Sequence, residues 1–274
     1  MSTPGTGVEG RLDIRIGPAR REVTISSSRP LAASRLFEGK TIDDTLGLVP
    51  LLFNVCGQAQ RTAAVRAIES AQGTAAGVEV EHARDRLVQL ETLREHLWRV
   101  LLEWPRFCGA APASGSMSLL MGRIEAAKRA IDGQGTLCTR LGLDRPAGAG
   151  GALPRELGAL RGIVAEHVLG IDPARWLDAG APELSRWIAH TDTPAAQLLR
   201  FVYSRDWEAI GQTESHAMPA LAAETLLAVL DGPGAAAFIA EPTLGEGSIE
   251  TGPGARQQRH PLIVAMRERH GPGL

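Results

Sequence analysis

The hydrophobic positions of this chain follow two different periods, which predict its architecture. Residues 11–16 and 22–26 alternate apolar and polar side chains, as strands with one buried face do. The turn sequence Gly17-Pro18-Ala19-Arg20 lies between them, so we expect an antiparallel β-hairpin. Beyond Val49-Pro50 apolar residues recur every three or four positions. We therefore predict a mainly α (α+β) fold, a helical body with a small N-terminal hairpin.

The helices can be placed from these spacings and from helix-breaking residues. The strongest pattern covers residues 82–104, and we expect that helix to end at Pro105. A weaker one runs from Ser116 to Ile131. Further helical segments are predicted near residues 33–37, from Thr41, and at 155–169, 182–190, 194–203, 218–230 and 261–269. Residues 241–260 are rich in Gly and Pro, which predicts irregular or short-stranded structure.

No internal repeat divides the chain, so we treat residues 1–274 as a single domain. The clearest linker is residues 145–154, whose Gly, Ala and Pro content predicts a mobile loop.

Composition narrows the class of protein. Hydrophobic residues make up 44% and charged residues 22%, as in a folded globular chain. The formal net charge of −2 gives no reason to expect nucleic acid or an anionic membrane as partner. Residues 1–10 lack the features of a signal peptide, and apolar runs such as 226–230 are too short to span a bilayer. With three cysteines far apart in sequence, we expect a cytoplasmic protein.

One cysteine lies where the local sequence favours a thiolate that could bind a metal. Cys56 is followed by Gly57 at the start of an Ala-rich helix, where the helix dipole and free backbone N–H groups favour a thiolate. A thiolate is a ligand for soft metals, and Gln60 projects an amide from the same helix face. The alternative is a buried Cys56 acting as a small hydrophobe. For Cys108 and Cys138, which lack any partner motif, we expect structural or incidental roles.

Residues 9–73 resemble the amino-terminal region of nickel–iron hydrogenase large subunits. The shared run starts at Glu9-Gly10-Arg11-Leu12, passes a Ser-Arg-Pro step and a Leu-Phe-Glu-Gly segment, and ends in Cys-Gly before an Ala-rich helix. Near the carboxyl end, residues 245–250 (Gly-Glu-Gly-Ser-Ile-Glu) resemble the large-subunit segment that places a glutamate, then an arginine, beside the metals.

The departures from that pattern identify a branch of the family. Ala59 stands where the second cysteine of a Cys-Gly-x-Cys site is expected, Ala63 replaces a histidine, and no cysteine follows Cys138. One thiolate cannot replace the four that hold nickel and iron. The sequence Cys-Gly-x-Ala-Gln, with Glu-Thr-Gly and Ala-Arg-Gln before His-Pro-Leu, is similar to the hydrogenase-assembly family called HupK or HoxV.

This resemblance implies a shortened large-subunit-like fold and a non-catalytic maturation factor. Such a protein would hold the Fe(CN)2(CO) fragment of the active site transiently, without nickel, and would work with maturation chaperones and the hydrogenase large subunit. Cys56 would ligate the iron, and the resemblance places four residues around the fragment: Gln60, Glu9, Glu250 and Arg256. The alternative for each of these four is an ordinary surface or capping role. Family members continue past the point that matches Leu274, so we expect a carboxyl-terminal truncation.

Two alternatives remain open. In one, the chain is a metal-free mimic of the large subunit that acts as an interaction or chaperone protein, with Cys56 in the core. In the other, it is an enzyme with an unrelated substrate in a degenerate pocket, a hypothesis that no acid–base set in the sequence supports.

Overall fold

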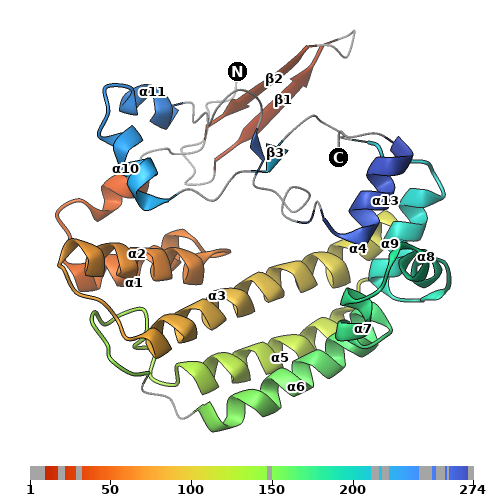
Figure 1. Ribbon diagram of the computed structural model, residues 1–274, viewed down its shortest axis with the longest axis horizontal. Helices are drawn as coiled ribbons and strands as arrows, with labels where there is room; N and C mark the ends of the chain where they lie inside the picture. The colour runs from red at the N-terminus through yellow and green to blue at the C-terminus, as the bar shows by residue number, and fades with distance from the viewer. Residues whose placement is uncertain are drawn as a thin grey trace, which may run out of the picture. The chain divides into compact units, whose positions relative to one another are not determined.

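A computed structural model describes residues 10–17, 22–28, 33–146, 150–210, 216–217, 222–240, 249–250, 257 and 259–270 (Figure 1). The described part is mainly helical with a small antiparallel two-stranded sheet, which confirms the predicted fold class. The chain divides into two compact units. Unit 1 comprises residues 1–84 and 135–146, and unit 2 comprises residues 85–134 and 147–274.

The hairpin of unit 1 forms as predicted, but its apolar face is not buried. Strand β1 (Leu12–Ile16) pairs with β2 (Val23–Ser27) so that Ile14 lies opposite Ile25. These two side chains are 56% and 64% exposed. The other large aliphatic residues of the two strands are exposed as well: Leu12, Ile16 and Val23. Alternation determines which side chains share a face, but not whether another element packs against it.

Two helices and a 3₁₀ turn follow the hairpin in unit 1. The 3₁₀ helix spans Ala33–Phe37, α1 spans Ile42–Leu52 and α2 spans Gly57–Ala71. Helix α1 begins where predicted, because the Thr41 hydroxyl accepts a hydrogen bond from the Asp44 N–H at 3.1 Å. Helices α1 and α2 pack together. The buried aliphatic side chains of unit 1 include Leu46, Val49, Val65 and Val80.

A buried ionic cluster ties segment 135–146 to α2 and to the start of α3 (Val78–Trp98). The Arg84 guanidinium, with no exposed surface, donates to the Glu69 carboxylate at 2.7 and 2.9 Å. It also donates to the Leu137 carbonyl at 2.7 Å, and Glu69 accepts from the Gly142 N–H at 2.9 Å. The cluster therefore satisfies both buried charges and holds a distant segment against α2.

The long helix that leads into unit 2 does not end at Pro105, so that prediction is wrong. Helix α3 is followed by a π-helical segment, Arg99–Glu103, and by α4, Trp104–Phe107. Pro105 is the second residue of α4, where a missing N–H is tolerated because first-turn amides have no intrahelical partner. The extra residue of the π turn shifts the backbone register before the proline.

The core of unit 2 lies where α5 (Ser114–Ile131) packs against α6 (Leu153–Val164). Leu120 and Ile124 are fully buried there. A π-helical segment, Ala165–Leu169, continues α6. A 3₁₀ helix, Gly150–Ala152, precedes α6. The other elements of the described part are α7 (Pro173–Leu177), α8 (Ala181–His190), α9 (Pro194–Tyr203), β3 (His216–Ala217), α10 (Ala223–Leu230), α11 (Ala235–Ala240), β4 (Ile249–Glu250) and α13 (Pro261–His270).

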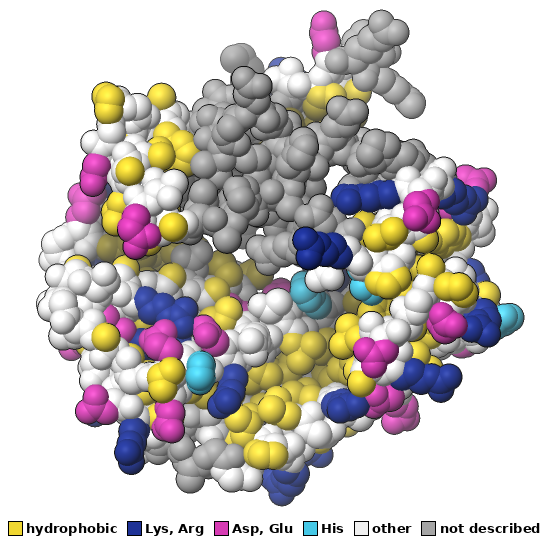
Figure 2. All heavy atoms as spheres, in the orientation of Figure 1, with side chains coloured by type: hydrophobic (Ala, Val, Ile, Leu, Met, Phe, Trp, Pro, Cys, Tyr) yellow, Lys and Arg dark blue, Asp and Glu magenta, His cyan; other side chains and the backbone are white. Residues whose placement is uncertain are grey.

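The segments predicted at 155–169, 182–190, 194–203 and 261–269 match these helices closely. Of the segment predicted at 218–230, residues 218–221 lie outside the described part, and α10 covers Ala223–Leu230. Of the predicted loop 145–154, residues 147–149 lie outside the described part, and α6 already starts at Leu153. Within the described ranges no helix is long and apolar enough to cross a bilayer. Figure 2 shows Lys and Arg side chains interspersed with Asp and Glu over the visible face.

Candidate functional site

Cys56 lies at the N-cap of α2, as the sequence predicts. Its carbonyl accepts the Gln60 N–H at 2.9 Å, while its side chain makes no capping hydrogen bond. The thiol is therefore not used to satisfy the helix end. Gly57 follows because α2 starts close to α1: a Cβ at this position would lie 3.1 Å from the Cα of Pro50. The glycine thus allows the close approach that fixes the position of Cys56.

Gln60 lies one helical turn after Cys56 and faces the same sulfur. Its Nε2 lies 3.9 Å from the Cys56 Sγ, a long contact of the kind that sulfur acceptors make. Cys56 is partly buried and Gln60 is exposed, so both residues have some surface in contact with solvent. The structure therefore brings together two of the predicted residues on one accessible end of α2.

A second thiol, that of Cys138, lies beneath α2. The sequence did not predict this position. Cys138 is 3% exposed, and its Sγ lies 3.2 Å from the Gln58 Nε2 and 3.5 Å from the Thr62 hydroxyl. The two glutamines of the motif thus point at different sulfurs, Gln58 at Cys138 and Gln60 at Cys56. Since Cys138 follows Gln58 by 80 residues, no local pattern could have predicted this contact.

The other predicted residues lie beyond what the structure describes. Glu9 and Arg256 are outside the described residues, and for Glu250 only the backbone is described. That backbone belongs to β4 and pairs in parallel with Ala217 of β3. The roles of these three residues stay predictions.

In the described part of the chain, few groups that could bind a metal surround Cys56. Among the residues that the structure describes, no group of three or more His, Cys, Asp and Glu side chains could hold a metal ion. Cys56 offers one sulfur, and Gln60 offers one amide beside it. A bare metal ion would need a closed cage of more ligands than these two groups provide.

Curated proteins with similar sequences carry names of one kind. HupK of Azotobacter vinelandii is 47% identical over 85 residues, which are 31% of this chain and 25% of that protein. HupV of Azotobacter chroococcum mcd 1 is 42% identical over 99 residues, 35% of this chain and 29% of HupV. HoxV of Cupriavidus necator is 29% identical over 202 residues, 72% of this chain and 47% of HoxV. Each is named a hydrogenase expression/formation protein.

These matches confirm the resemblance to HupK and HoxV. The chain spans less than half the length of these relatives. No protein-family model and no solved structure matches it.

Proposed function

We propose that this relative of the HupK, HupV and HoxV proteins takes part in hydrogenase maturation by holding the Fe(CN)2(CO) fragment transiently. Cys56 is the iron ligand, and Gln60 is the neighbouring hydrogen-bond donor. The chain receives the fragment from maturation chaperones and passes it to the hydrogenase large subunit. Nickel is not part of its cargo.

The observation that carries this proposal is the geometry of Cys56. Cys56 lies at the N-terminus of a 15-residue helix, the residue is partly exposed, and its side chain makes no capping bond. The positive end of the helix dipole favours an anionic cargo at this point. The similarity to hydrogenase expression/formation proteins supports the iron–diatomic fragment as the proposed cargo.

The chemistry of the cargo fits a site with few protein ligands. Low-spin iron with cyanide and carbonyl ligands is soft and binds thiolate. Because the fragment carries its own diatomic ligands, one sulfur can hold it. The amide N–H of Gln60 can donate to a cyanide nitrogen, which orients the fragment without a further covalent bond. A single anchor also permits release, which a carrier needs and a four-thiolate site would hinder.

The same residues argue against catalysis by this chain. Ala59 and Ala63 stand where a large subunit has a cysteine and a histidine, and neither side chain can bind a metal. We therefore propose a maturation factor and not a hydrogenase.

Infrared spectroscopy tests the carrier function directly. The chain is co-expressed with a hydrogenase maturation system, purified without oxygen, and examined in the CN and CO stretching region. We expect bands in the unaltered protein, their loss in Cys56→Ala, and a shifted CN band in Gln60→Ala. Cys108→Ala is the matched control, because Cys108 is also partly exposed but belongs to unit 2. Absence of bands, or equal bands in Cys56→Ala, would rule out this carrier site.

A second candidate function is favoured by the exposed hairpin. Five large aliphatic side chains of β1 and β2 are more than half exposed. Contiguous exposed apolar surface is typical of protein interfaces. In this alternative the chain imitates the large subunit to recruit assembly proteins and holds no metal.

Affinity capture separates the two functions. If recruitment is the function, Ile14→Asp with Ile25→Asp will abolish capture of the hydrogenase large subunit, while Cys56→Ala will leave it unchanged. Thr24→Asp is the control, because Thr24 lies on β2 next to Ile25 but on the opposite face of the hairpin. Capture that survives the hairpin variant would rule out the hairpin as the recruiting surface.

A further inference from the structure

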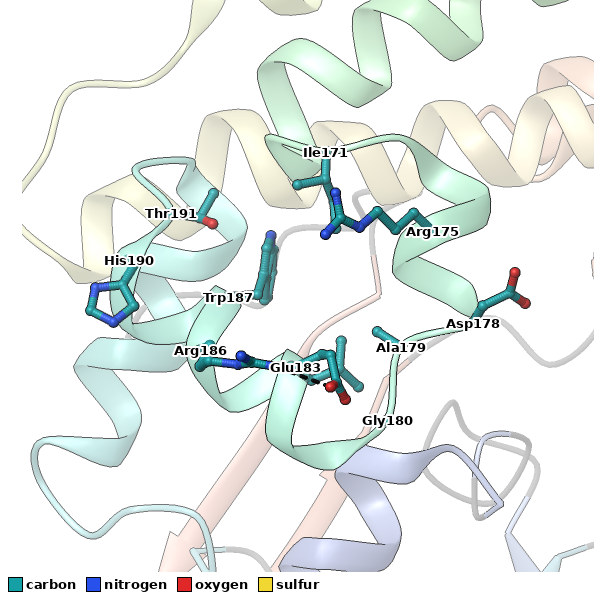
Figure 3. Close-up of a pocket in the computed structure, with 11 residues that line it drawn as sticks. Ile171, Arg175, Asp178, Ala179, Gly180, Glu183, Arg186, Trp187, His190 and Thr191 are labelled. Carbon is teal, nitrogen blue, oxygen red and sulfur yellow. Dashed lines mark hydrogen bonds and ion pairs between the residues drawn. The ribbon is translucent and has the colours of Figure 1, made fainter.

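We propose that the pocket between α7 and α8 of unit 2 is a binding site for a monocarboxylate carried on an apolar body. The pocket has a volume of about 540 Å³, within the range of small-ligand sites. Its wall is formed by the end of the turn before α7, by α7 itself, and by α8 (Figure 3). It belongs to unit 2, whereas Cys56 belongs to unit 1, so the inference does not depend on the iron cargo.

The apolar part of the pocket is held rigid by its surroundings. Leu184 and Trp187 are buried, and Ile171 lies across from the Trp187 ring. The Trp187 indole N–H donates to the Leu169 carbonyl, and the ring packs edge-on against Trp176 at a centroid distance of 5.6 Å. Because its rotamer is set by these contacts, the indole presents a fixed apolar surface to a ligand.

One cation of the pocket is available to a ligand. Arg175 extends its guanidinium from α7 toward the side of the pocket that holds Ile171 and Trp187 (Figure 3). Its side chain makes no hydrogen bond or ion pair with any described residue, although its backbone N–H donates to Asp172. A guanidinium beside an apolar surface recognises a carboxylate by two parallel hydrogen bonds.

The remaining charges limit the ligand to a monoanion. Glu183 is neutralised by Arg186 at 2.9 Å, and the dashed line in Figure 3 marks this pair. Asp178 and His190 lie at opposite edges of the pocket in that view. Because Arg175 is the available cation and the Asp178 carboxylate lies at the rim, a dianion such as a phosphate ester would be repelled. The apolar wall accommodates the body of the ligand, and Arg175 binds its carboxylate.

Binding measurements with the full chain test this site. The probes are 3-phenylpropionate, its amide and phenyl phosphate, with the tripeptide Ala-Ala-Phe in its free-acid and amidated forms. Ligand-observed NMR detects binding, and titration calorimetry gives the affinities. We expect the carboxylates to bind about tenfold or more tightly than the matching amides, because both accept from the charged Arg175 guanidinium but only the carboxylate is itself charged. Tighter binding of the peptide acid than of phenylpropionate would assign the carboxylate to a protein terminus, and the reverse to a free metabolite.

Variants connect the binding to the pocket. Arg175→Gln is expected to remove the preference for acid over amide, and Arg175→Lys to retain part of it. Arg129→Gln is the matched control, since Arg129 is exposed on α5, far along the chain from α7. The inference is overturned if no carboxylate binds, if phenyl phosphate binds more tightly than phenylpropionate, or if Arg175→Gln leaves the preference unchanged.

Discussion

Replacement of Arg84 by methionine is expected to destabilise unit 1 selectively. The guanidinium is fully buried and forms hydrogen bonds with Glu69, Glu81 and the Leu137 carbonyl. Methionine fills a similar volume but cannot donate. Glu69, whose side chain is 5% exposed, would then keep the Gly142 N–H but lose its charged partner.

The size of the effect follows from the burial of both groups. Breaking a buried ion pair from one side typically costs about 3–5 kcal/mol, because a charge stays behind without its partner. Every 1.4 kcal/mol is a factor of ten, so local opening of unit 1 should rise by roughly two to three orders of magnitude or slightly more. Removing one partner costs this much because the other charge stays buried, whereas removing both partners together costs far less.

Hydrogen–deuterium exchange can locate the effect along the chain. Peptides from α2 and from residues 135–146 should exchange faster in Arg84→Met, while peptides from α6 and α8 should not change. All five tryptophans lie in the ranges of unit 2, so the fluorescence-detected unfolding transition provides an internal control. The double variant Arg84→Met with Glu69→Leu should recover most of the stability, because it removes both charges. A single variant that costs less than about 1 kcal/mol, or a double variant that is weaker than the single one, would refute this reasoning.

Three further predictions concern stability. Hydrogen bonds from Arg84 hold the pKa of Glu69 below its usual value of 4.5. The ionised Glu69 carboxylate therefore contributes fully to the stability of unit 1 above pH 4.5, and this contribution is lost as pH falls through the lower folded-state pKa. Hydrogen–deuterium exchange in α2, measured at decreasing pH, should show this loss, and Glu69→Gln should abolish it. Gly77→Ala would place a Cβ 2.1 Å from the Asp144 carbonyl oxygen, so it should displace segment 135–146 and lower the stability of unit 1 by about 1–3 kcal/mol. Unchanged hydrogen–deuterium exchange in residues 135–146 would contradict the close contact between Gly77 and Asp144. Leu120→Ala should lower the fluorescence-detected stability of unit 2 by about 2–5 kcal/mol, because its side chain is fully buried; a change below 1 kcal/mol would indicate that the core is not formed there.

Local patterns were enough to predict most helices and the geometry of the motif. Helices α5, α8, α9 and α13 appear near their predicted residues because spacings of three and four require a helix to place apolar side chains on one face. The proximity of Gln60 to Cys56 was predictable for the same reason, as residues one turn apart share a face. The prediction that the helix ends at Pro105 was wrong, because a π turn before the proline shifts the backbone register and a further helical turn follows.

The sequence by itself determined the mainly helical fold, the N-cap position of Cys56 and the kinship with hydrogenase formation proteins. Tertiary structure decided which apolar faces are buried, which distant segment covers α2, and where Cys138 and Arg84 find their partners. The hairpin shows the difference, because its alternation is regular and its apolar face is nevertheless exposed. Periodicity is a property of neighbouring residues, whereas burial depends on whether a segment far along the chain packs on the same surface.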